Sequence, residues 1–264
     1  MPELPEVETF VRGLQSIAGS RIEDAEVLDE RLNLSAKPLR GAMIQSVERR
    51  GKHIVIGLGA TGDLVIHLRM SGRLRLERTE AEIPYTRLIL HLDSGEAVHF
   101  VNPRRLGTAT LCRDGFVEIL GVEPLSEAFT AEALAGIAAG SRAPIKHLLL
   151  DQRKIAGIGN IYAAEALWRA KLDPRRTARS LEGDEVAALH EAIINVLSEA
   201  IDQLGTTLGT SVSNYKPTGE MPGGFQNLLS VYARESEPCA RCSKTIERIV
   251  QAGRSTYLCP SCQR

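Results

Sequence analysis

Four cysteines near the C-terminus constrain the fold of this chain more than any other feature of its sequence. They form two pairs, Cys239 with Cys242 and Cys259 with Cys262, with two residues inside each pair and sixteen between the pairs. This spacing lets both thiolates of a pair bind one ion, and four thiolates complete the tetrahedral shell that zinc prefers. A complete shell leaves no position for a substrate, so the sequence predicts one structural Zn²⁺ in a zinc ribbon.

The segment between the two pairs is expected to form a short β-hairpin that carries three basic residues, Lys244, Arg248 and Arg254. A bound metal would order this hairpin and let its cations contact phosphates. The fifth cysteine, Cys112, lies in an apolar stretch and is expected to be a small buried hydrophobe. Cysteines used as metal ligands rather than in disulfides indicate a reducing compartment, so we expect a cytoplasmic protein.

The sequence gives no sign of membrane association. The chain begins Met1-Pro2-Glu3 and lacks the basic start and apolar stretch of a secretory signal peptide. No apolar run approaches the roughly 20 residues needed to cross a bilayer. We therefore expect no membrane partner.

Charge is distributed unevenly along a chain whose net charge is only −1. Residues 49–75 contain six Lys or Arg against one acid, whereas residues 182–202 contain six acids and no Lys or Arg. A net charge near zero argues against a nucleic-acid partner, because phosphate binding usually appears as a basic excess. Segregated charge can still form one basic face that binds a polyanion, or it can simply form two solvated surfaces. The charge pattern alone does not distinguish these two interpretations.

Residues 1–118 are predicted to form a helix followed by an antiparallel β-sandwich. Apolar residues recur at helical spacing from Pro5 until Gly19. Short apolar runs separated by Gly, Asp and Pro then predict strands at 44–47, 54–58, 64–68, 88–92, 97–101 and 108–111.

The pattern changes to helices in residues 126–230, where helices are expected at 130–139, 144–150, 161–170 and 185–204. The glycine-rich link at 151–160 could present backbone amides to a phosphate. Residues 205–230 have little periodicity, which is typical of a mobile loop. With the zinc ribbon at 231–264, the sequence predicts an α+β chain of three domains.

The N-terminus offers a reactive amine if Met1 is removed. Pro2 would then expose a secondary amine, and an α-amino pKa of about 8 leaves on the order of a tenth of it neutral at pH 7. A neutral amine can attack C1′ of a damaged nucleoside, and the resulting iminium acidifies the C2′ protons, so that elimination breaks the 3′ and then the 5′ phosphate. Glu3, just ahead of a helix start, is placed to protonate the sugar ring oxygen. An ordinary chain terminus could carry the same two residues.

The opening segment MPELPEVE at 1–8 resembles that of bacterial formamidopyrimidine-DNA glycosylases, and the resemblance continues in order along nearly the whole chain. The later matching segments are RRGK at 49–52, HLRMSG at 67–72, NPRRLG at 102–107, residues 152–167 and the zinc ribbon. The resemblance implies a helix-flanked β-sandwich, a helix-two-turn-helix domain and a zinc ribbon, with damaged double-stranded DNA between the lobes. It also implies a monomeric, nucleoid-associated enzyme that excises formamidopyrimidines and 8-oxoguanine through an N-terminal proline Schiff base and β,δ-elimination.

The resemblance assigns roles to individual residues as well. Pro2, Glu3 and Lys52 are implied as catalytic residues. Met70 is implied to fill the gap left by an everted nucleotide, and Arg104 to contact the orphaned base. The remaining implied DNA-binding residues are His67, Arg105, Leu106, Asn160 and Arg254.

Two departures from the family pattern concern lesion preference. The third void-filling position is usually aromatic, but here it is Leu106, which can wedge between bases and cannot stack on them. The loop expected to cap an everted purine falls at Leu208 to Phe225 and differs from the commonest form.

Two alternatives stay open at this point. One is an endonuclease VIII-like glycosylase for oxidised pyrimidines, although Leu4 and Val7 favour the formamidopyrimidine branch. The other is a non-catalytic protein that binds damaged DNA. The joint presence of Pro2, Glu3 and Lys52 argues against this alternative.

Overall fold

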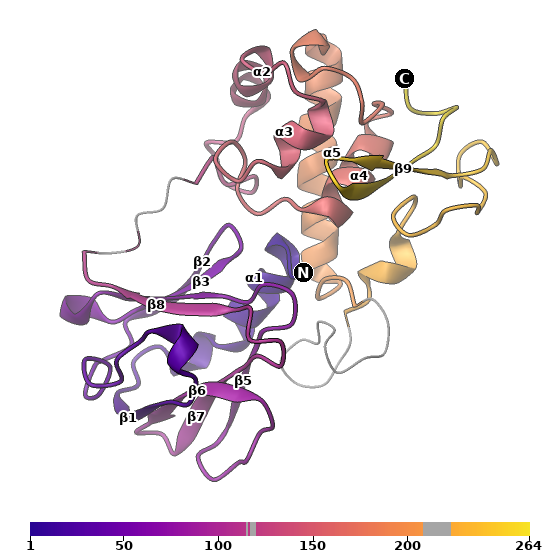
Figure 1. Ribbon diagram of the computed structural model, residues 1–264. Coiled ribbons are helices and arrows are strands. Elements are labelled where there is room, and N and C mark those ends of the chain that lie inside the picture. The colour runs from indigo at the N-terminus through magenta and orange to yellow at the C-terminus, as the bar shows by residue number, and fades with distance from the viewer. Residues whose placement is uncertain (115, 117–119, 208–222) are drawn as a thin grey trace. The chain divides into compact units, whose positions relative to one another are not determined.

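The computed structural model describes residues 1–114, 116, 120–207 and 223–264 (Figure 1). The chain divides into two compact units: unit 1 comprises Met1–Glu118 with Gln203–Gly224, and unit 2 comprises Ile119–Asp202 with Phe225–Arg264. The predicted division into three domains at 1–118, 126–230 and 231–264 stays a prediction.

Unit 1 begins with helix α1, Leu4–Gly13, whose N-terminal cap is Glu3. The helix is shorter than predicted, because a separate 3₁₀ turn follows at Gln15–Ile17. Leu14 and Ile17 are nevertheless fully buried. The 3₁₀ turn faces the same core as the helix, and this is why the apolar spacing continues past the helix end.

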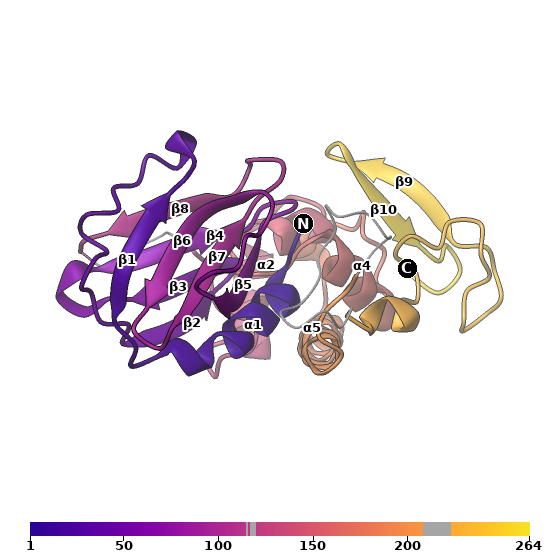
Figure 2. The same cartoon turned by 90° about the horizontal axis from the view of Figure 1, so that it is seen from below.

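Two four-stranded antiparallel sheets form the rest of the unit 1 core, one in the order β1-β6-β7-β5 and the other in the order β2-β3-β4-β8. The first contains β1 (Ile22–Val27), β5 (Arg73–Arg78), β6 (Thr86–Leu92) and β7 (Glu96–Val101). The second contains β2 (Ser46–Arg50), β3 (His53–Gly57), β4 (Asp63–His67) and β8 (Thr108–Cys112). Figure 2 shows the two sheets of unit 1 layered on one another, with α1 beside them. Apolar side chains from both sheets and from α1 join in one buried cluster. The predicted helix and β-sandwich are thus confirmed.

The sequence prediction missed strands β1 and β5. They are the two edge strands of their sheet, and β1 carries Glu23 and Asp24 while β5 alternates arginine with leucine. Charged residues on edge strands discourage pairing with other chains. In β1 they interrupt the apolar pattern, whereas the alternation in β5 was a strand signal that the prediction overlooked. The strand predicted at 44–47 lies at Ser46–Arg50 instead.

Unit 2 contains the four predicted helices, now bounded as α2 (Ala131–Ala139), α3 (Ile145–Leu150), α4 (Asn160–Arg169) and α5 (Gly183–Asp202). The predicted C-terminal hairpin is formed by β9 (Glu247–Gln251) and β10 (Arg254–Leu258), and Lys244 precedes it. Of the segment 205–230, residues 208–222 lie outside the described residues, and Phe225–Leu228 form a 3₁₀ turn. None of the helices described is both long and apolar enough to span a membrane.

Candidate active site and nucleic-acid interface

The N-terminal end of α1 is held in place by a buried carboxylate. Pro2 and Glu3 are both buried, and the Glu3 backbone N–H donates to Glu6 Oε2 at 2.7 Å as half of a capping box. The other oxygen, Glu6 Oε1, accepts from the Thr206 N–H at 2.8 Å. A Cβ on Gly205, whose φ is +78°, would lie 2.7 Å from Glu6 Oε1. This close approach therefore requires glycine.

Lys52 lies in the turn between β2 and β3, with only 6% of its surface exposed. Two contacts fix the direction of α1 along β2. Gln15 Nε2 donates to the Val47 carbonyl at 2.8 Å, and Arg49 Nε donates to Glu8 Oε2 at 3.0 Å. The N-terminal end of α1 therefore points toward the β2–β3 turn, so the three predicted catalytic residues lie at the same end of this helix and hairpin.

His67 ends β4 and is held as a neutral imidazole. Burial lowers its pKa to about 3, and the nearby charges of His53, Arg69 and Lys52 act in the same direction. His67 Nδ1 accepts the backbone N–H of Arg69 at 3.0 Å. The ring proton is thereby assigned to Nε2, which can donate one hydrogen bond to an anion such as a phosphate.

The structure brings two predicted void-filling segments together. His67 pairs with Thr108 across β4 and β8, so the turn after β4 lies beside the loop 102–107 that precedes β8. Arg104 Nη2 donates to the Met70 carbonyl oxygen at 2.9 Å. Met70 and Leu106 are 44% and 52% exposed. Both side chains are therefore accessible to a ligand at this end of the second sheet.

Arg105, the neighbour of these residues, has a protein partner. Its guanidinium makes a bidentate ion pair with Asp29. The implied role of Arg105 as a DNA ligand stays a prediction.

In unit 2, the structure places Asn160 beside the strand that carries Arg254. Asn160 is the first residue of α4, and its Nδ2 donates to the Ser255 carbonyl at 3.0 Å. The buried ammonium of Lys146 on α3 donates to the same carbonyl at 3.0 Å and to Thr256 Oγ1 at 2.6 Å. Because Arg254 adjoins Ser255 and is exposed, the first turn of α4 and the hairpin form one surface with donors for phosphate.

A single side chain organises the loop that leads into α4. Gln152 Nε2 donates to the carbonyls of Leu150 at 3.0 Å and Ile158 at 2.9 Å, while Gln152 Oε1 accepts the N–H of Gly157 at 2.9 Å. Gly157 has φ +86°, a conformation that favours glycine. Hydrogen bonds from the Gln152 side chain therefore fix the backbone conformation of this loop.

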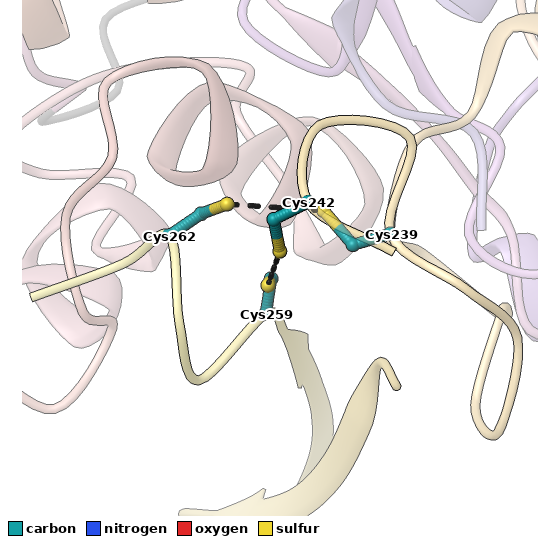
Figure 3. Close-up of side chains that lie close together, drawn as sticks. All are labelled: Cys239, Cys242, Cys259 and Cys262. Carbon is teal, nitrogen blue, oxygen red and sulfur yellow. Dashed lines mark hydrogen bonds between the residues drawn. The ribbon is translucent and has the colours of Figure 1, made fainter. Parts of the chain in front are cut away.

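The four predicted zinc ligands converge at the base of the hairpin (Figure 3). All four sulfurs lie within 4.8 Å of one another, with Cys239 to Cys262 at 4.0 Å and Cys242 to Cys259 at 3.5 Å. Tetrahedral zinc with Zn–S bonds of about 2.3 Å sets its sulfurs roughly 3.8 Å apart. The donor set therefore fits one structural Zn²⁺.

Helix α4 supports the ribbon through packing and charge. Trp168 packs in one apolar cluster with Cys239 and Cys259. Arg241 lies 3.8 Å above the Trp168 ring and donates to the Trp168 and Arg169 carbonyls at 2.5 and 3.0 Å. These contacts satisfy the last carbonyls of α4 and fix the ribbon to it.

Glu165 anchors the segment that leads into the ribbon. Its fully buried carboxylate accepts the backbone N–H groups of Ser230, Val231 and Tyr232 at 2.8, 3.0 and 2.8 Å. Burial raises the pKa of Glu165, and the three amide bonds oppose that shift. Sequence reasoning missed this residue, although an acid inside the apolar run of α4 was a visible signal, because a buried carboxylate requires donors. Glu6 was missed in the same way, although its place three residues after Glu3 is the spacing of a capping box.

Three family profiles match consecutive parts of the chain. The formamidopyrimidine-DNA glycosylase N-terminal domain matches residues 1–109, and the formamidopyrimidine-DNA glycosylase H2TH domain matches residues 120–212. A zinc finger found in FPG and IleRS matches residues 236–264.

Similarity to known proteins also extends over the full length. The chain is 43% identical to a formamidopyrimidine-DNA glycosylase of Gluconobacter oxydans, over 100% of both sequences. The crystal structure of the MutM (FPG) protein of Thermus thermophilus superimposes with a TM-score of 0.88 at 41% identity, covering 99% of this chain and 98% of that one. A Lactococcus lactis FPG bound to abasic-site DNA superimposes with a TM-score of 0.87 at 33% identity, covering 99% of each chain. A Lactococcus lactis FPG mutant bound to DNA containing Fapy-dG gives 0.88 at 33% identity and 100% coverage of both.

Proposed function

The chain belongs to the formamidopyrimidine-DNA glycosylase family, and we propose that it excises oxidised purines from duplex DNA and then cleaves the exposed sugar-phosphate as a lyase. The observation that carries the proposal is the full-length structural match to a family member bound to Fapy-dG DNA. That match includes the N-terminal segment in which Pro2 and Glu3 are buried at the end of α1.

The chemistry begins at the Pro2 nitrogen. Its lone pair attacks C1′ of the damaged nucleotide and displaces the base, and the proton that the base takes up is balanced by the proton that the Pro2 nitrogen loses. Glu3 protonates the ring oxygen as the sugar opens, and the product is an iminium between Pro2 and C1′. Loss of a C2′ proton then expels the 3′ phosphate, and a second elimination expels the 5′ phosphate. Water finally hydrolyses the iminium, which releases the remaining sugar fragment as an aldehyde and frees Pro2.

Access to C1′ requires that the damaged nucleotide leave the base stack, at a cost of a few kcal/mol. Met70, Arg104 and Leu106 would enter the gap and offset part of that cost. Lys52 and the neutral His67, through Nε2–H, would bind phosphates around the everted nucleotide. Asn160 and Arg254 would bind phosphates on the surface of unit 2.

The zinc would contribute rigidity to the hairpin that carries Arg254 and would take no part in bond breaking. We also propose that the protein acts as a monomer on DNA in the bacterial cytoplasm, because each of the residues that this chemistry needs is present in one chain. Light scattering of the protein with and without duplex would test the oligomeric state.

The proposed function is tested with a duplex that contains a single 8-oxoguanine. We expect release of the free base and a one-nucleotide gap with phosphate on both ends, as β,δ-elimination requires. A matched duplex with 5-hydroxycytosine in the same position should be cut more slowly. Faster cleavage of the pyrimidine duplex, or binding without cleavage of either duplex, would contradict the proposal.

Discrimination of the base opposite the lesion should rest mainly on Arg104. Its guanidinium can donate to acceptors on the orphaned base, whereas Leu106 offers only shape and apolar contact. We expect Arg104→Ala to reduce the preference for one opposite base about tenfold, because a bidentate contact is worth about 1–3 kcal/mol of discrimination. We expect Leu106→Phe to keep the ranking of opposite bases.

The measurement is single-turnover excision of 8-oxoguanine opposite each of the four bases in the parent and both variants. An unchanged ranking in Arg104→Ala would show that this residue does not read the orphaned base.

A further inference from the structure

A buried carboxylate fixes the loop 102–107 to the first sheet of unit 1. Asp29 lies two residues beyond β1, and its side chain is only 2% exposed. Arg105 donates from Nε to Asp29 Oδ2 at 2.7 Å and from Nη2 to Asp29 Oδ1. A bidentate pair of this kind fixes the orientation of both side chains as well as their separation.

A second arginine links the same carboxylate to the start of the loop. Arg87 Nε lies 3.8 Å from Asp29 Oδ2 and donates to the Asn102 carbonyl oxygen at 3.2 Å. Asn102 in turn closes the loop, because its Nδ2 donates to the Gly107 carbonyl at 3.3 Å. The Arg105 guanidinium holds the pKa of Asp29 at about 2. Asp29 is therefore ionised at neutral pH. Through Arg87 and Asn102, its contacts extend to both ends of the loop.

The backbone of Arg105 explains why the loop needs an anchor. Arg105 has φ +54°, in the left-handed region that residues with a Cβ rarely adopt. Its N–H donates to the Asn102 carbonyl at 3.2 Å. Arg105 stands between Arg104 and Leu106 in the chain, so its backbone conformation sets the directions in which both neighbours project. The residue in the unfavourable conformation is also the one whose side chain Asp29 holds.

We propose that Asp29 is a positioning residue for recognition of the base opposite the lesion, acting by holding Arg105 so that Arg104 and Leu106 project in fixed directions. The inference rests on the proposed function, because it concerns how that enzyme reads the orphaned base. It assigns Arg105 a role within the protein, in place of the phosphate contact that a basic residue beside DNA would otherwise suggest.

The test compares Asp29→Asn with the parent in single-turnover excision of 8-oxoguanine opposite each of the four bases. Asparagine keeps the size of the side chain and removes the charge and the second acceptor that Arg105 requires. We expect the ratio between the best and the worst opposite base to fall about tenfold, which is the discrimination expected from one bidentate hydrogen-bonded pair with a base. Borohydride trapping on a baseless duplex should change by less than about threefold, because that reaction needs no reading of an orphaned base. A ratio equal to that of the parent would overturn the proposal.

A double-mutant cycle separates positioning from direct binding of DNA. If Arg105 acts through Asp29, the variant with both Asp29→Asn and Arg105→Gln will have the same opposite-base ratio as either single variant. If Arg105 is instead a phosphate ligand, Arg105→Gln will weaken binding equally for all four duplexes and reduce the salt slope of binding by about one. That second outcome, with the ratio unchanged, would also overturn the proposal.

Arg40→Gln provides the matched control, because Arg40 pairs with Asp24 in the same unit at 2.5 Å but with both side chains more than half exposed. It should leave the ratio unchanged. If thermal unfolding shows that Asp29→Asn is not folded, Arg105→Lys is measured in its place. Lysine keeps the positive charge but lacks the planar guanidinium that binds both carboxylate oxygens, so the opposite-base ratio should fall in the same way. A parent protein that neither excises nor traps would refute the proposed function. If the parent is active and both variants keep its opposite-base ratio, the positioning role alone is refuted.

Discussion

Protein that retains Met1 is expected to lose the covalent adduct that borohydride traps on damaged duplex, by about a thousandfold or more, the scale expected when a nucleophile is removed. With Met1 in place the Pro2 nitrogen is an amide and cannot attack. The Met1 amine would stand one residue away, by about 3.5 Å, from the position of the nucleophile. Pro2→Gly should reduce trapping sharply as well, because the secondary amine is replaced by a primary one. Binding of a duplex with a non-cleavable abasic analogue should change little in either protein.

The control is Pro38→Gly, which changes a half-buried proline outside the predicted site and should trap like the parent. N-terminal mass analysis of each preparation identifies which protein retains Met1. Full trapping by protein that retains Met1 would place the nucleophile elsewhere.

Cys259→Ser is expected to reduce bound zinc from one per chain to near zero and to weaken DNA binding. Cys259 is fully buried and its sulfur lies 3.5 Å from that of Cys242. Metal binding supplies about 10–16 kcal/mol of folding free energy in isolated zinc fingers, so removal of the metal should disorder the hairpin. Arg254 would then no longer be held beside Asn160, and the salt slope of DNA binding should fall by about one for each phosphate that the hairpin no longer neutralises.

Cys112→Ser is the matched control, because Cys112 is half-buried at the end of β8 in unit 1 and is not among the four clustered cysteines. It should keep both the zinc and the affinity. Elemental analysis that finds no zinc in active parent protein would contradict the structural role of the metal.

The zinc ligands and the main elements of the fold could be predicted because their signals are local. Two cysteine pairs within 24 residues specify a metal site, and apolar periodicity specifies a helix or a central strand. Edge strand β1 lacked a clear signal because acidic residues interrupt its apolar pattern, whereas β5 carried the signal in its alternation of arginine with leucine and was overlooked. The fold class was therefore predictable, while the edge strand β1 was not.

The positioning contacts could not be predicted, because they join residues far apart in the chain. Asp29 and Arg105 are 76 positions apart, and Glu6 and Thr206 are 200 positions apart. Nothing in the sequence around Asp29 distinguishes it from a solvated turn residue. Only the pairing of β1 with β6 and of β4 with β8 gives this carboxylate its partners.

Pro2 can be identified as the nucleophile by peptide mapping of the parent protein after borohydride trapping on a duplex with 8-oxoguanine. The proposed mechanism predicts one DNA remnant per chain, attached to the peptide that begins at Pro2. A remnant attached to the peptide that contains Lys52, or cleavage of the duplex without any covalent adduct, would contradict it.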